Sequence, residues 1–436
     1  MTRTLDEWLA YQEKTHPRDI ELGLDRVRAV WESMGAPRPA PLVITVGGTN
    51  GKGSTVALLE GMLRAAGYRT GCYTSPHLLR YNERVRIDGI DVADDAFVAS
   101  FERIEAARGS IPQTYFEFGT LAAIDLMARA SVDVAILEVG LGGRLDAVNI
   151  IDADLAIVTT IGLDHQDWLG GDRDSIGREK AGIARAARPV VVGELDPPEG
   201  LLEALRGLGA VVERAGSVFW WEVEGLGPSR AGALLQGLST GRWRWTHQDG
   251  AAFDLPRPAL AAPVQFANAS AAIAALHALR DRVQVPQAAI AHALETVRVG
   301  GRLQRIGEHP LTLVDVGHNP QAARALAAWL DARAPGGRVL AVYGALADKD
   351  VAGVIAALGS RVDHWFLAGL ERDTPRGLPA EALAQALAAT LPDAPHDAFP
   401  DVASAWQAAS ALAGEADTLL LFGSFFVASA ALSTPR

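Results

Sequence analysis

Residues 42–54 read LVITVGGTNGKGS, and this stretch decides the fold. Residues 42–46 are apolar or β-branched without interruption, as is typical of a strand buried on both faces of a parallel sheet. A glycine-rich turn follows, and residues 54–66 show helical periodicity up to Gly67. The pattern predicts a strand, a loop and a helix, with backbone N–H groups at the helix N-terminus wrapping an anion.

The loop is a variant of the P-loop. Its residues are Gly48, Thr49, Asn50, Gly51, Lys52, Gly53 and Ser54. Lys52 supplies a positive charge for a phosphate, and the Ser54 hydroxyl can reach phosphate or Mg²⁺. The strict P-loop has Gly before four variable residues and Ser or Thr directly after Lys, whereas this chain has Val46 and Gly53 at those two positions. The alternative interpretation is a glycine turn with an unrelated lysine.

Apolar runs alternate with helical stretches through most of the first 200 residues. We predict strands at 42–46, 70–73, 132–139, 155–160 and 189–192, and helices at 5–16, 20–34, 54–66, 118–129 and 175–186. The alternation implies a parallel sheet with helices on both faces. Residues 215–260 differ, because tryptophans set among polar residues indicate antiparallel hairpins.

The strand and helix pattern restarts near residue 300. Strands are predicted at 311–316, 339–343, 362–367 and 418–422, between Ala-rich helices. A chain of 436 residues also exceeds the roughly 250–300 residues that one core usually serves. We therefore predict two α/β domains, residues 1–297 with the P-loop and residues 298–436 with a smaller Rossmann-like sheet.

Composition narrows the classes of partner. The chain has 52 acidic and 40 basic residues, a net charge of -12, so we expect small-molecule partners and no nucleic acid. We expect no secretion and no membrane span, because no basic and apolar leader and no run of eighteen apolar residues occurs. Cys72 is the single cysteine, which excludes an intramolecular disulfide and fits a cytoplasmic protein with a packed thiol.

Polar residues follow three of the predicted strands. Ser75 follows the strand at 70–73, Glu138 ends the next apolar run, and His165 follows the strand at 155–160. Ligands collect at the carboxyl ends of parallel strands, and Mg²⁺ accepts carboxylate and hydroxyl oxygens there. These residues predict a Mg²⁺ site; a salt-bridged Glu138 and a packed or capping His165 are the alternatives. Lys180, on a predicted helix, would by position alone be a surface lysine.

Ten motifs occur in a fixed order along the chain. They are GTNGKGS (48–54), TSPHLLRYNERVRI (74–87), EVGLGGRLDAVN (138–149), DHQDWLG (164–170), REKAGI (178–183), FANASAA (266–272), GRLQ (301–304), DVGHNP (315–320), ADKD (347–350) and GSFF (423–426). Together they resemble the folylpolyglutamate synthase family of the Mur ligase superfamily, in its bacterial form that also acts as dihydrofolate synthase. The resemblance covers nearly the whole chain and is weakest at residues 195–260.

The resemblance implies roles for individual residues. It implies ATP binding by Thr49, Asn50, Gly51, Lys52, Gly53, Ser54, Asn268, Arg302 and Asp315; Mg²⁺ binding by Ser75, Glu138 and His165, with two metal sites; and catalytic roles for Lys52, Lys180 and His318. Lys180 matches a lysine that becomes carbamylated, because an N-carboxylate offers oxygens to Mg²⁺ where an ammonium repels it. His318 follows Val316 and Gly317, a minor departure from many relatives, and is expected to contact nucleotide or glutamate.

Three segments match the pterin-binding part of the bacterial bifunctional enzymes. They comprise Asp19, Ile20, Glu21 and Leu22; Thr114, Tyr115, Phe116 and Glu117; and Leu145, Asp146 and Ala147. Phe116 is expected to stack on the flat heterocycle. Thr114 and Glu117 also have the spacing of a helix capping box, and the two roles are compatible.

The implied activity is ATP-dependent ligation of L-glutamate to dihydropteroate and successive γ-glutamylation of tetrahydrofolates, through an acyl phosphate. The implied partners are ATP, L-glutamate, dihydropteroate and reduced folates, and family habit indicates a monomer. A first alternative is a Mur-type ligase acting on peptidoglycan or another amino-acid polymer, against which the segments TSPHL and GRLDA stand. A second is a nucleotide-dependent switch, which leaves the DVGHNP loop of the second α/β domain unexplained.

Overall fold

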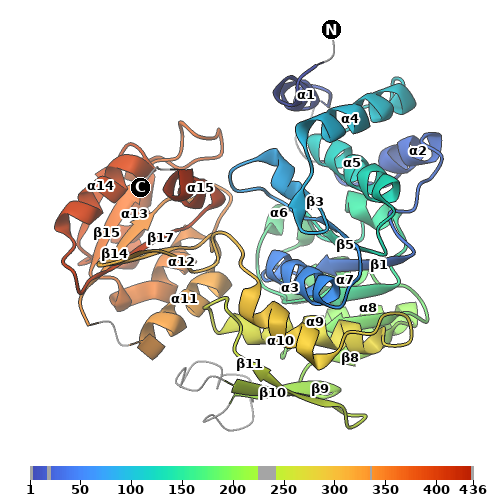
Figure 1. The fold of residues 1–436 in the computed structure, drawn as a ribbon. Helices are drawn as coiled ribbons and strands as arrows, with labels where there is room; N and C mark the ends of the chain where they lie inside the picture. The colour runs from blue at the N-terminus through green and yellow to red at the C-terminus, as the bar shows by residue number, and fades with distance from the viewer. Residues whose placement is uncertain (1–2, 17–20, 224–241, 334–335, 434–436) are drawn as a thin grey trace.

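The computed structural model describes residues 3–16, 21–223, 242–333 and 336–433 (Figure 1). The described chain forms an eight-stranded sheet, a three-stranded sheet and a six-stranded sheet. The six-stranded sheet and its helices form the C-terminal unit, which lies beside the P-loop unit at the left of Figure 1. The predicted α/β fold, with a large parallel sheet followed by a smaller one, is confirmed.

The first sheet has the order β4-β3-β2-β5-β1-β6-β7-β8. Its strands are β1 (Leu42–Gly47), β2 (Thr70–Tyr73), β3 (Val85–Ile87), β4 (Ile90–Asp91), β5 (Val134–Glu138), β6 (Leu155–Val158), β7 (Pro189–Val192) and β8 (Val211–Arg214). Neighbours from β2 to β8 run parallel, and β3 and β4 add antiparallel pairs at one edge. β1 lies in the middle, so its carboxyl end and the P-loop lie at the centre of one sheet edge.

Helices cover both faces of this sheet. One face carries α1 (Leu5–Gln12), α2 (Asp25–Ser33), α4 (Asp94–Arg108), α5 (Tyr115–Ala130), α7 (Arg173–Ala181) and α8 (Glu199–Leu208); the other carries α3 (Lys52–Ala65), α9 (Val264–Ala278) and α10 (Gln287–Thr296). Short helices are α6 (Gln166–Leu169) and the 3₁₀ turns Tyr81–Arg84 and Ala147–Ile150. Val43 packs into the first core, whereas Leu42 and Ile44 pack into the second, which is why β1 is apolar throughout.

The predicted hairpins are confirmed as a three-stranded antiparallel sheet. It consists of β9 (Phe219–Val223), β10 (Arg242–His247) and β11 (Ala252–Pro256), in the order β11-β10-β9. Trp221, Trp243 and Trp245 are buried in the core that includes α9, whereas Trp220 points the other way and is half-buried. The tryptophans therefore fill the space between this small sheet and α9.

The C-terminal unit repeats the sandwich of helices around a sheet. Its strands are β12 (Gln304–Glu308), β13 (Leu311–Val314), β14 (Val339–Tyr343), β15 (His364–Ala368), β16 (His396–Phe399) and β17 (Thr418–Phe422). Their order is β12-β13-β17-β14-β15-β16, and only the β12–β13 pair is antiparallel. One face packs against α11 (Pro320–Arg333), α12 (Val351–Leu358) and α13 (Ala380–Thr390), and the other against α14 (Val402–Leu412) and α15 (Phe425–Ser433), with a 3₁₀ turn at Gly359–Arg361.

Element boundaries differ from the predictions where capping overrides periodicity. The helix predicted at 54–66 begins earlier, at Lys52, because Gly51 adopts a left-handed conformation and serves as the N-cap. The helix predicted at 175–186 ends at Ala181, with Gly182 as its C-cap. Strand β16 was not predicted, because most of its residues are exposed at a sheet edge and carry no apolar run.

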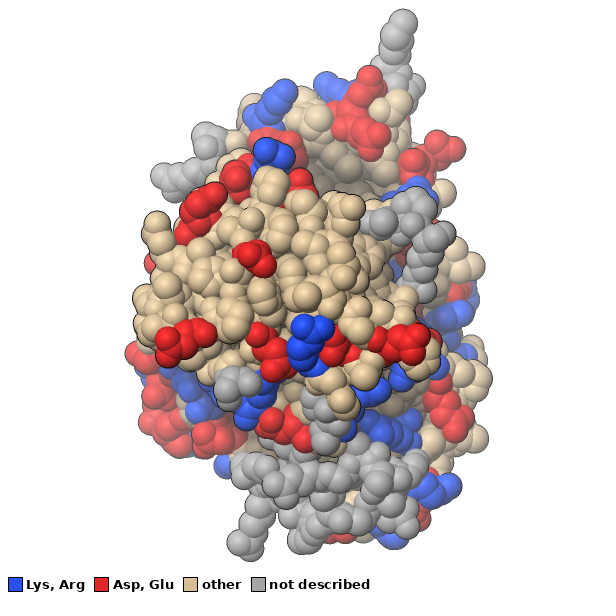
Figure 2. Space-filling model, turned by 90° about the vertical axis from the view of Figure 1, so that its left-hand side faces the viewer, with Lys and Arg blue, Asp and Glu red and all other residues tan. Residues whose placement is uncertain are grey.

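One face of the C-terminal unit is sparsely charged. Figure 2 shows the side of the molecule that lies at the left of Figure 1, where uncharged residues cover the middle of the face. On this side of the unit, α14 contains no charged residue and Glu381 is the only one in α13. Within the described chain, every helix falls short of the length and hydropathy needed to cross a bilayer.

We expect the small sheet to depend on its buried tryptophans. Trp221→Ala removes a fully buried ring and should lower the free energy of unfolding by about 3–5 kcal/mol. Trp220→Ala, the matched control on the opposite face of the same strand, should cost about 1 kcal/mol or less. Urea denaturation of both variants measures the difference; equal losses would contradict the packing described for β9.

Candidate active site

One cavity of about 280 Å³ lies where the carboxyl ends of β1, β2, β5 and β6 face the C-terminal unit. It is lined by every residue predicted for ATP, metal or catalysis: Thr49, Asn50, Gly51, Lys52, Gly53, Ser54, Ser75, Glu138, His165, Lys180, Asn268, Arg302, Asp315 and His318. These residues span some 270 positions of sequence, and both α/β units contribute. The structure therefore gathers the three predicted groups into one site.

Two glycines of the P-loop lie in close contact with side chains from other elements. Gly51 has φ of 87°, and a Cβ added there would collide with the Asn268 side chain on α9. A Cβ at Gly48, where φ is 141°, would collide with the Thr159 hydroxyl. Glycine is required at both positions, and the close approach of Asn268 explains how α9 reaches the loop. Asn268 thereby lies beside the N-terminus of α3, where a phosphate is expected to bind.

Two lysines, the half-buried Lys52 and the buried Lys180, meet at one carbonyl oxygen. Lys52 Nζ donates to the backbone oxygens of Gly48 and Thr49 at 3.1 Å each, and Lys180 Nζ donates to the same Gly48 oxygen at 2.9 Å. Burial, followed by the charge of Lys52, lowers the pKa of Lys180 to about 7. Burial also lowers the pKa of Lys52. The surface-lysine alternative for Lys180 is therefore wrong.

Glu138 ends β5 inside the cavity and is buried. Its carboxylate accepts a hydrogen bond from the backbone amide of Ser75 at 3.2 Å. No ion pair involves Glu138 among the residues that the structure describes, so the salt-bridge alternative is not supported. Burial raises its pKa. A buried carboxylate that accepts this hydrogen bond still has oxygen lone pairs that can bind a cation.

His165 lies at the N-cap of α6 with φ of 51°, but its side chain makes no capping hydrogen bond. Burial lowers the pKa of His165 to about 4, so the imidazole is neutral at pH 7 and can offer a lone pair to a metal. Its Nε2 atom lies 3.5 Å from Nζ of Lys349 and 3.9 Å from Asp164. The capping alternative for His165 is therefore not supported by its contacts.

Asp164 connects the two units. Its carboxylate lies 2.7 Å from Lys349 Nζ, 3.4 Å from His318 Nε2 and 3.2 Å from the amide nitrogen of Asn319. Although burial opposes ionisation, the His318 hydrogen bond and the charge of Lys349 hold the pKa of Asp164 far below its usual range. Both side chains of the Asp164–Lys349 pair are less than one-tenth exposed. A buried ion pair thus joins the loop after β6 to the loop after β14.

Asp315 and Arg302, the other predicted site residues of the C-terminal unit, are each held by contacts within that unit. Asp315 accepts hydrogen bonds from the backbone amides of Leu303 and Gly317, both at 2.7 Å. Burial raises the pKa of Asp315 and lowers that of Arg302. The Arg302 guanidinium lies 5.5 Å from the centre of the Phe425 ring. The Arg302 side chain is thereby positioned against the cavity wall, facing the P-loop.

Sequence reasoning assigned no role to several residues that meet here. Asn50 donates to Asn319 at 3.1 Å and to Gln321 at 2.6 Å, across the junction of the two units. Lys349, Asn319 and Asp164 belong to motifs that were recognised, but sequence alone does not reveal their mutual contacts. Their position directly after predicted strands was the available signal.

The predicted pterin segments also converge, although Asp19 and Ile20 lie outside the described residues. Arg26 links two of the segments, at 2.7 Å from Glu21 and 3.1 Å from Glu117. The amide of Gly23, next to Leu22, donates to the backbone oxygen of Leu145 at 3.3 Å, which brings in the third segment. The sequence did not predict this role of Arg26, because no motif around Arg26 indicates that its side chain contacts Glu21 and Glu117.

Phe116 lies against the loop that follows β5. A Cβ added to Gly140 would approach its ring to 2.6 Å, and Gly140 itself lines the cavity. Thr114 and Glu117 form the expected capping box at the start of α5, and Tyr115 follows the cap, half-buried. The described residues of the pterin segments therefore adjoin the cavity without lining it.

Asp146 organises the same glycine loop. Its carboxylate accepts backbone hydrogen bonds from Gly140 at 3.0 Å, Leu141 at 2.9 Å and Val148 at 3.0 Å. Burial raises its pKa to about 6. Ala147, the next residue, begins a buried 3₁₀ turn. Asp146 thus holds the loop between Phe116 and the P-loop in shape.

The sequence matches two family models, the Mur ligase middle domain over residues 46–205 and the Mur ligase glutamate ligase domain over residues 301–425. The chain is also similar to dihydrofolate synthase/folylpolyglutamate synthase from Escherichia coli, with 46% identity over 97% of this chain and 93% of the relative. The Haemophilus influenzae enzyme of the same name is 39% identical over 97% of this chain and 96% of its own length. The chain belongs to the dihydrofolate synthase/folylpolyglutamate synthase family.

Solved structures of this family have the same fold. An Escherichia coli FolC structure in complex with DHPP and ADP matches with a TM-score of 0.90 and 45% identity, over 99% of this chain and 97% of that one. A bifunctional folylpolyglutamate synthase/dihydrofolate synthase with Mn, AMPPNP and L-glutamate bound matches with a TM-score of 0.88 and 44% identity, over 99% and 98%. The family fold therefore extends over both α/β units and the small sheet that packs on α9.

We expect the buried Asp164–Lys349 pair to stabilise the junction of the units. Lys349→Met leaves the Asp164 carboxylate buried without its ammonium partner and should lower the free energy of unfolding by about 3 kcal/mol. Arg361→Met removes an exposed ion pair to Asp331 and should cost under about 1 kcal/mol. Chemical denaturation compares the two variants. A loss in Lys349→Met as small as in the control would show that the pair does not hold the units together.

Proposed function

We propose that this protein ligates L-glutamate to dihydropteroate and then extends tetrahydrofolates by successive γ-glutamylation, using ATP. The observation that carries the proposal is the single cavity at the junction of the units, lined by the phosphate loop, the strand-end oxygen donors and the residues of the C-terminal unit. The bound ligands of the related structures, ADP with DHPP and AMPPNP with Mn and L-glutamate, support the same chemistry. The Mur-type ligase of peptidoglycan is the remaining alternative.

The cationic groups of the cavity match the negative charge of a nucleoside triphosphate. Lys52, Lys180 and Arg302 bring three cationic groups into a buried space, and burial lowers the pKa of all three. An anion bound between the three cationic groups offsets the cost of removing their charges from water. We propose that the phosphates lie along Thr49 to Ser54 at the N-terminus of α3, with Asn268, Arg302 and Asp315 contacting the nucleotide.

The donor set fits divalent cations. Glu138 supplies a buried carboxylate with spare acceptor capacity, Ser75 a hydroxyl and His165 a neutral imidazole, and all three line the cavity. We propose two Mg²⁺ positions held by these residues and by a modified Lys180. When bound at this site, Mg²⁺ would neutralise negative charge on the phosphates of the nucleotide.

The chain's own residues perform the remaining work. The substrate carboxylate attacks the γ-phosphate of ATP and forms an acyl phosphate, the bond to the β-phosphate breaks, and ADP leaves. The Lys52 ammonium neutralises charge that develops on the phosphate oxygens. The amine of glutamate then displaces phosphate from the acyl phosphate to form the amide. His318 donates from Nδ1 to the Val316 backbone oxygen at 2.9 Å and has its Nε2 atom 3.4 Å from Asp164. It lines the cavity and is proposed to contact nucleotide or glutamate. Enclosure between the two units excludes water from the acyl phosphate.

The environment of Lys180 favours carbamylation. A lysine attacks CO₂ only as the free amine, and a pKa near 7 leaves about half of Lys180 unprotonated at neutral pH. Carbamylation converts a second cation at the Gly48 oxygen into an anion, which reverses its effect on a neighbouring metal. We therefore propose that the active enzyme carries a carbamate on Lys180.

The pterin is proposed to lie among the three convergent segments. Phe116 offers an aromatic face beside Gly140, on the path from the segments to the cavity. Glu21 and Glu117 are held by Arg26, which keeps the first and second segments together. We also propose a cytoplasmic monomer whose partners are small molecules, without nucleic-acid or membrane binding.

Phosphate release with purified protein tests the function. With ATP, Mg²⁺ and L-glutamate, release should depend on glutamate and occur with either dihydropteroate or tetrahydrofolate, because one cavity serves both ligations. UDP-linked muramyl acceptors should support none. Release with tetrahydrofolate alone would restrict the activity to polyglutamylation. Release with the muramyl acceptor would favour the Mur-type alternative, and release without any acceptor would reject ligation.

Lys180→Ala tests the carbamate. We expect ligation to fall by about 100-fold or more, since the variant loses the proposed metal-binding oxygens. With ¹³C-bicarbonate, the wild type should show a carbamate NMR signal that grows from about pH 6 to about pH 8, as the Lys180 ammonium loses its proton. Lys14→Ala, at an exposed lysine, should keep both activity and signal. A signal that persists in Lys180→Ala would assign the carbamate to another amine.

A further inference from the structure

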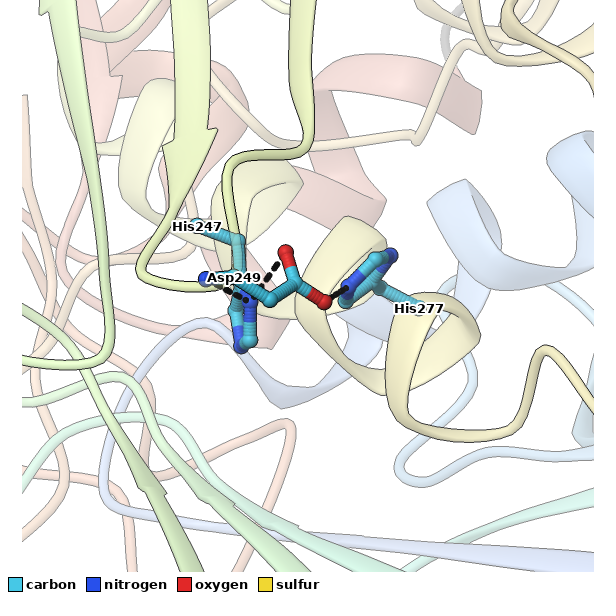
Figure 3. A group of neighbouring side chains, drawn as sticks. All are labelled: His247, Asp249 and His277. Atoms are coloured by element: carbon cyan, nitrogen blue, oxygen red, sulfur yellow. Dashed lines mark hydrogen bonds and ion pairs between the residues drawn. The ribbon is translucent and has the colours of Figure 1, made fainter.

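Two histidines and two carboxylates meet beside the three-stranded sheet, and none of them lines the active-site cavity. Figure 3 shows three of them, His247, Asp249 and His277. His247 ends β10, and Asp249 lies in the turn that leads to β11. His277 comes from the last turn of α9, and Glu213 comes from β8 of the large sheet. The cluster therefore joins three parts of the fold that are distant in sequence.

The hydrogen bonds of His247 define which ring nitrogen carries a proton. Its Nε2 atom lies 3.1 Å from a Glu213 carboxylate oxygen, which can only accept, so Nε2 carries the proton. Its Nδ1 atom accepts a hydrogen bond from the backbone amide of Asp249 at 3.2 Å. In this neutral tautomer Nδ1 has a lone pair and no proton.

That lone pair faces an oxygen that also lacks a proton. His247 Nδ1 lies 2.8 Å from one carboxylate oxygen of Asp249, and His277 Nε2 lies 2.8 Å from the other. Two acceptors at this distance repel each other unless a positive charge lies between them. The charge is either a second proton on the His247 ring or a bound cation. Arg280 is farther from Asp249, at 3.8 Å, and its distance is to the oxygen that faces His277, not to the oxygen that faces His247.

The arrangement has the geometry of a metal site. The three ligand atoms lie within 4.8 Å of one another, and the side chains of both histidines are about nine-tenths buried. Ligands of a tetrahedral Zn²⁺, at about 2.0–2.2 Å from the ion, lie about 3.4 Å apart, so small shifts would close the site. Trp245 stacks on His247 with 6.0 Å between ring centres and meets His277 edge-on at 5.6 Å, which limits both rings.

We propose that His247, Asp249 and His277 bind one transition-metal ion of the Zn²⁺ class, with Glu213 orienting His247 from behind. Two imidazoles and a carboxylate select Zn²⁺ or Co²⁺ over Mg²⁺, which requires oxygen ligands. A carboxylate that accepts from the second nitrogen of a ligating histidine is the usual support of such a ligand. The ion ties the turn between β10 and β11 to the end of α9, the helix whose other end carries Asn268.

Metal titration of the full-length protein tests the site. The protein is freed of metal with EDTA, supplied with saturating Mg²⁺ and titrated with Co²⁺, whose visible absorption reports nitrogen ligands; Zn²⁺ then displaces it. We expect the wild type to bind one equivalent more than His277→Gln, and Zn²⁺ to raise the melting temperature of the wild type more than that of His277→Gln. Any Co²⁺ at the active-site His165 is common to both proteins and cancels in the comparison.

Glu213→Gln tests the orienting role, with an expected loss of about 10–100-fold in metal affinity and no loss of stoichiometry. His364→Gln is the matched control, because His364 lies 2.9 Å from Asp397 but belongs to no group of three metal-ligand side chains among the described residues, and it should keep the extra equivalent. Asp249→Asn serves as a second ligand variant if His277→Gln melts early without metal. Equal stoichiometry in the wild type and both ligand variants would overturn the proposal and assign the cluster to protonated imidazoles paired with carboxylates.

Discussion

The amines of Lys52 and Lys180 share one acceptor, the backbone oxygen of Gly48, at the centre of the molecule. Burying two cations around a single carbonyl is unfavourable, and the depressed pKa of Lys180 expresses that cost. The arrangement makes sense only if anions complete it. The glycine loop, the central position of β1 and the early start of α3 all serve to present backbone N–H groups and these two amines to the same small space.

The second constraint is that the cavity is incomplete without the C-terminal unit. Asp164 pairs with Lys349 and contacts His318 and Asn319, so the loop after β6 is fastened to the opposite unit. Arg302 and Asp315 then face the phosphate loop from the other side. A reaction through an acyl phosphate requires such enclosure, because water would otherwise compete with the amine.

The small three-stranded sheet contributes to the structure through its packing on α9. Its buried tryptophans pack on α9, the helix that carries Asn268 to the P-loop, and the His247 cluster lies at the far end of the same helix. Both features hold α9 against the large sheet. The described residues of the Trp-rich segment therefore support the position of α9 and do not line the active-site cavity.

The sequence by itself determined the two α/β units, the phosphate loop and the ATP, metal and catalytic residues that line the cavity. Continuous apolar runs, as in β1, and glycine turns before helices are local patterns with few alternative structures. It missed β16, an exposed edge strand without such a run, and extended the helix of Lys180 past Gly182. Only the tertiary structure decided that Lys180 is buried beside Lys52, that Arg26 joins the pterin segments and that Lys349 pairs with Asp164. The reason is physical: burial and charge pairing arise between residues far apart in the chain, and no local pattern of side chains encodes which of them will meet.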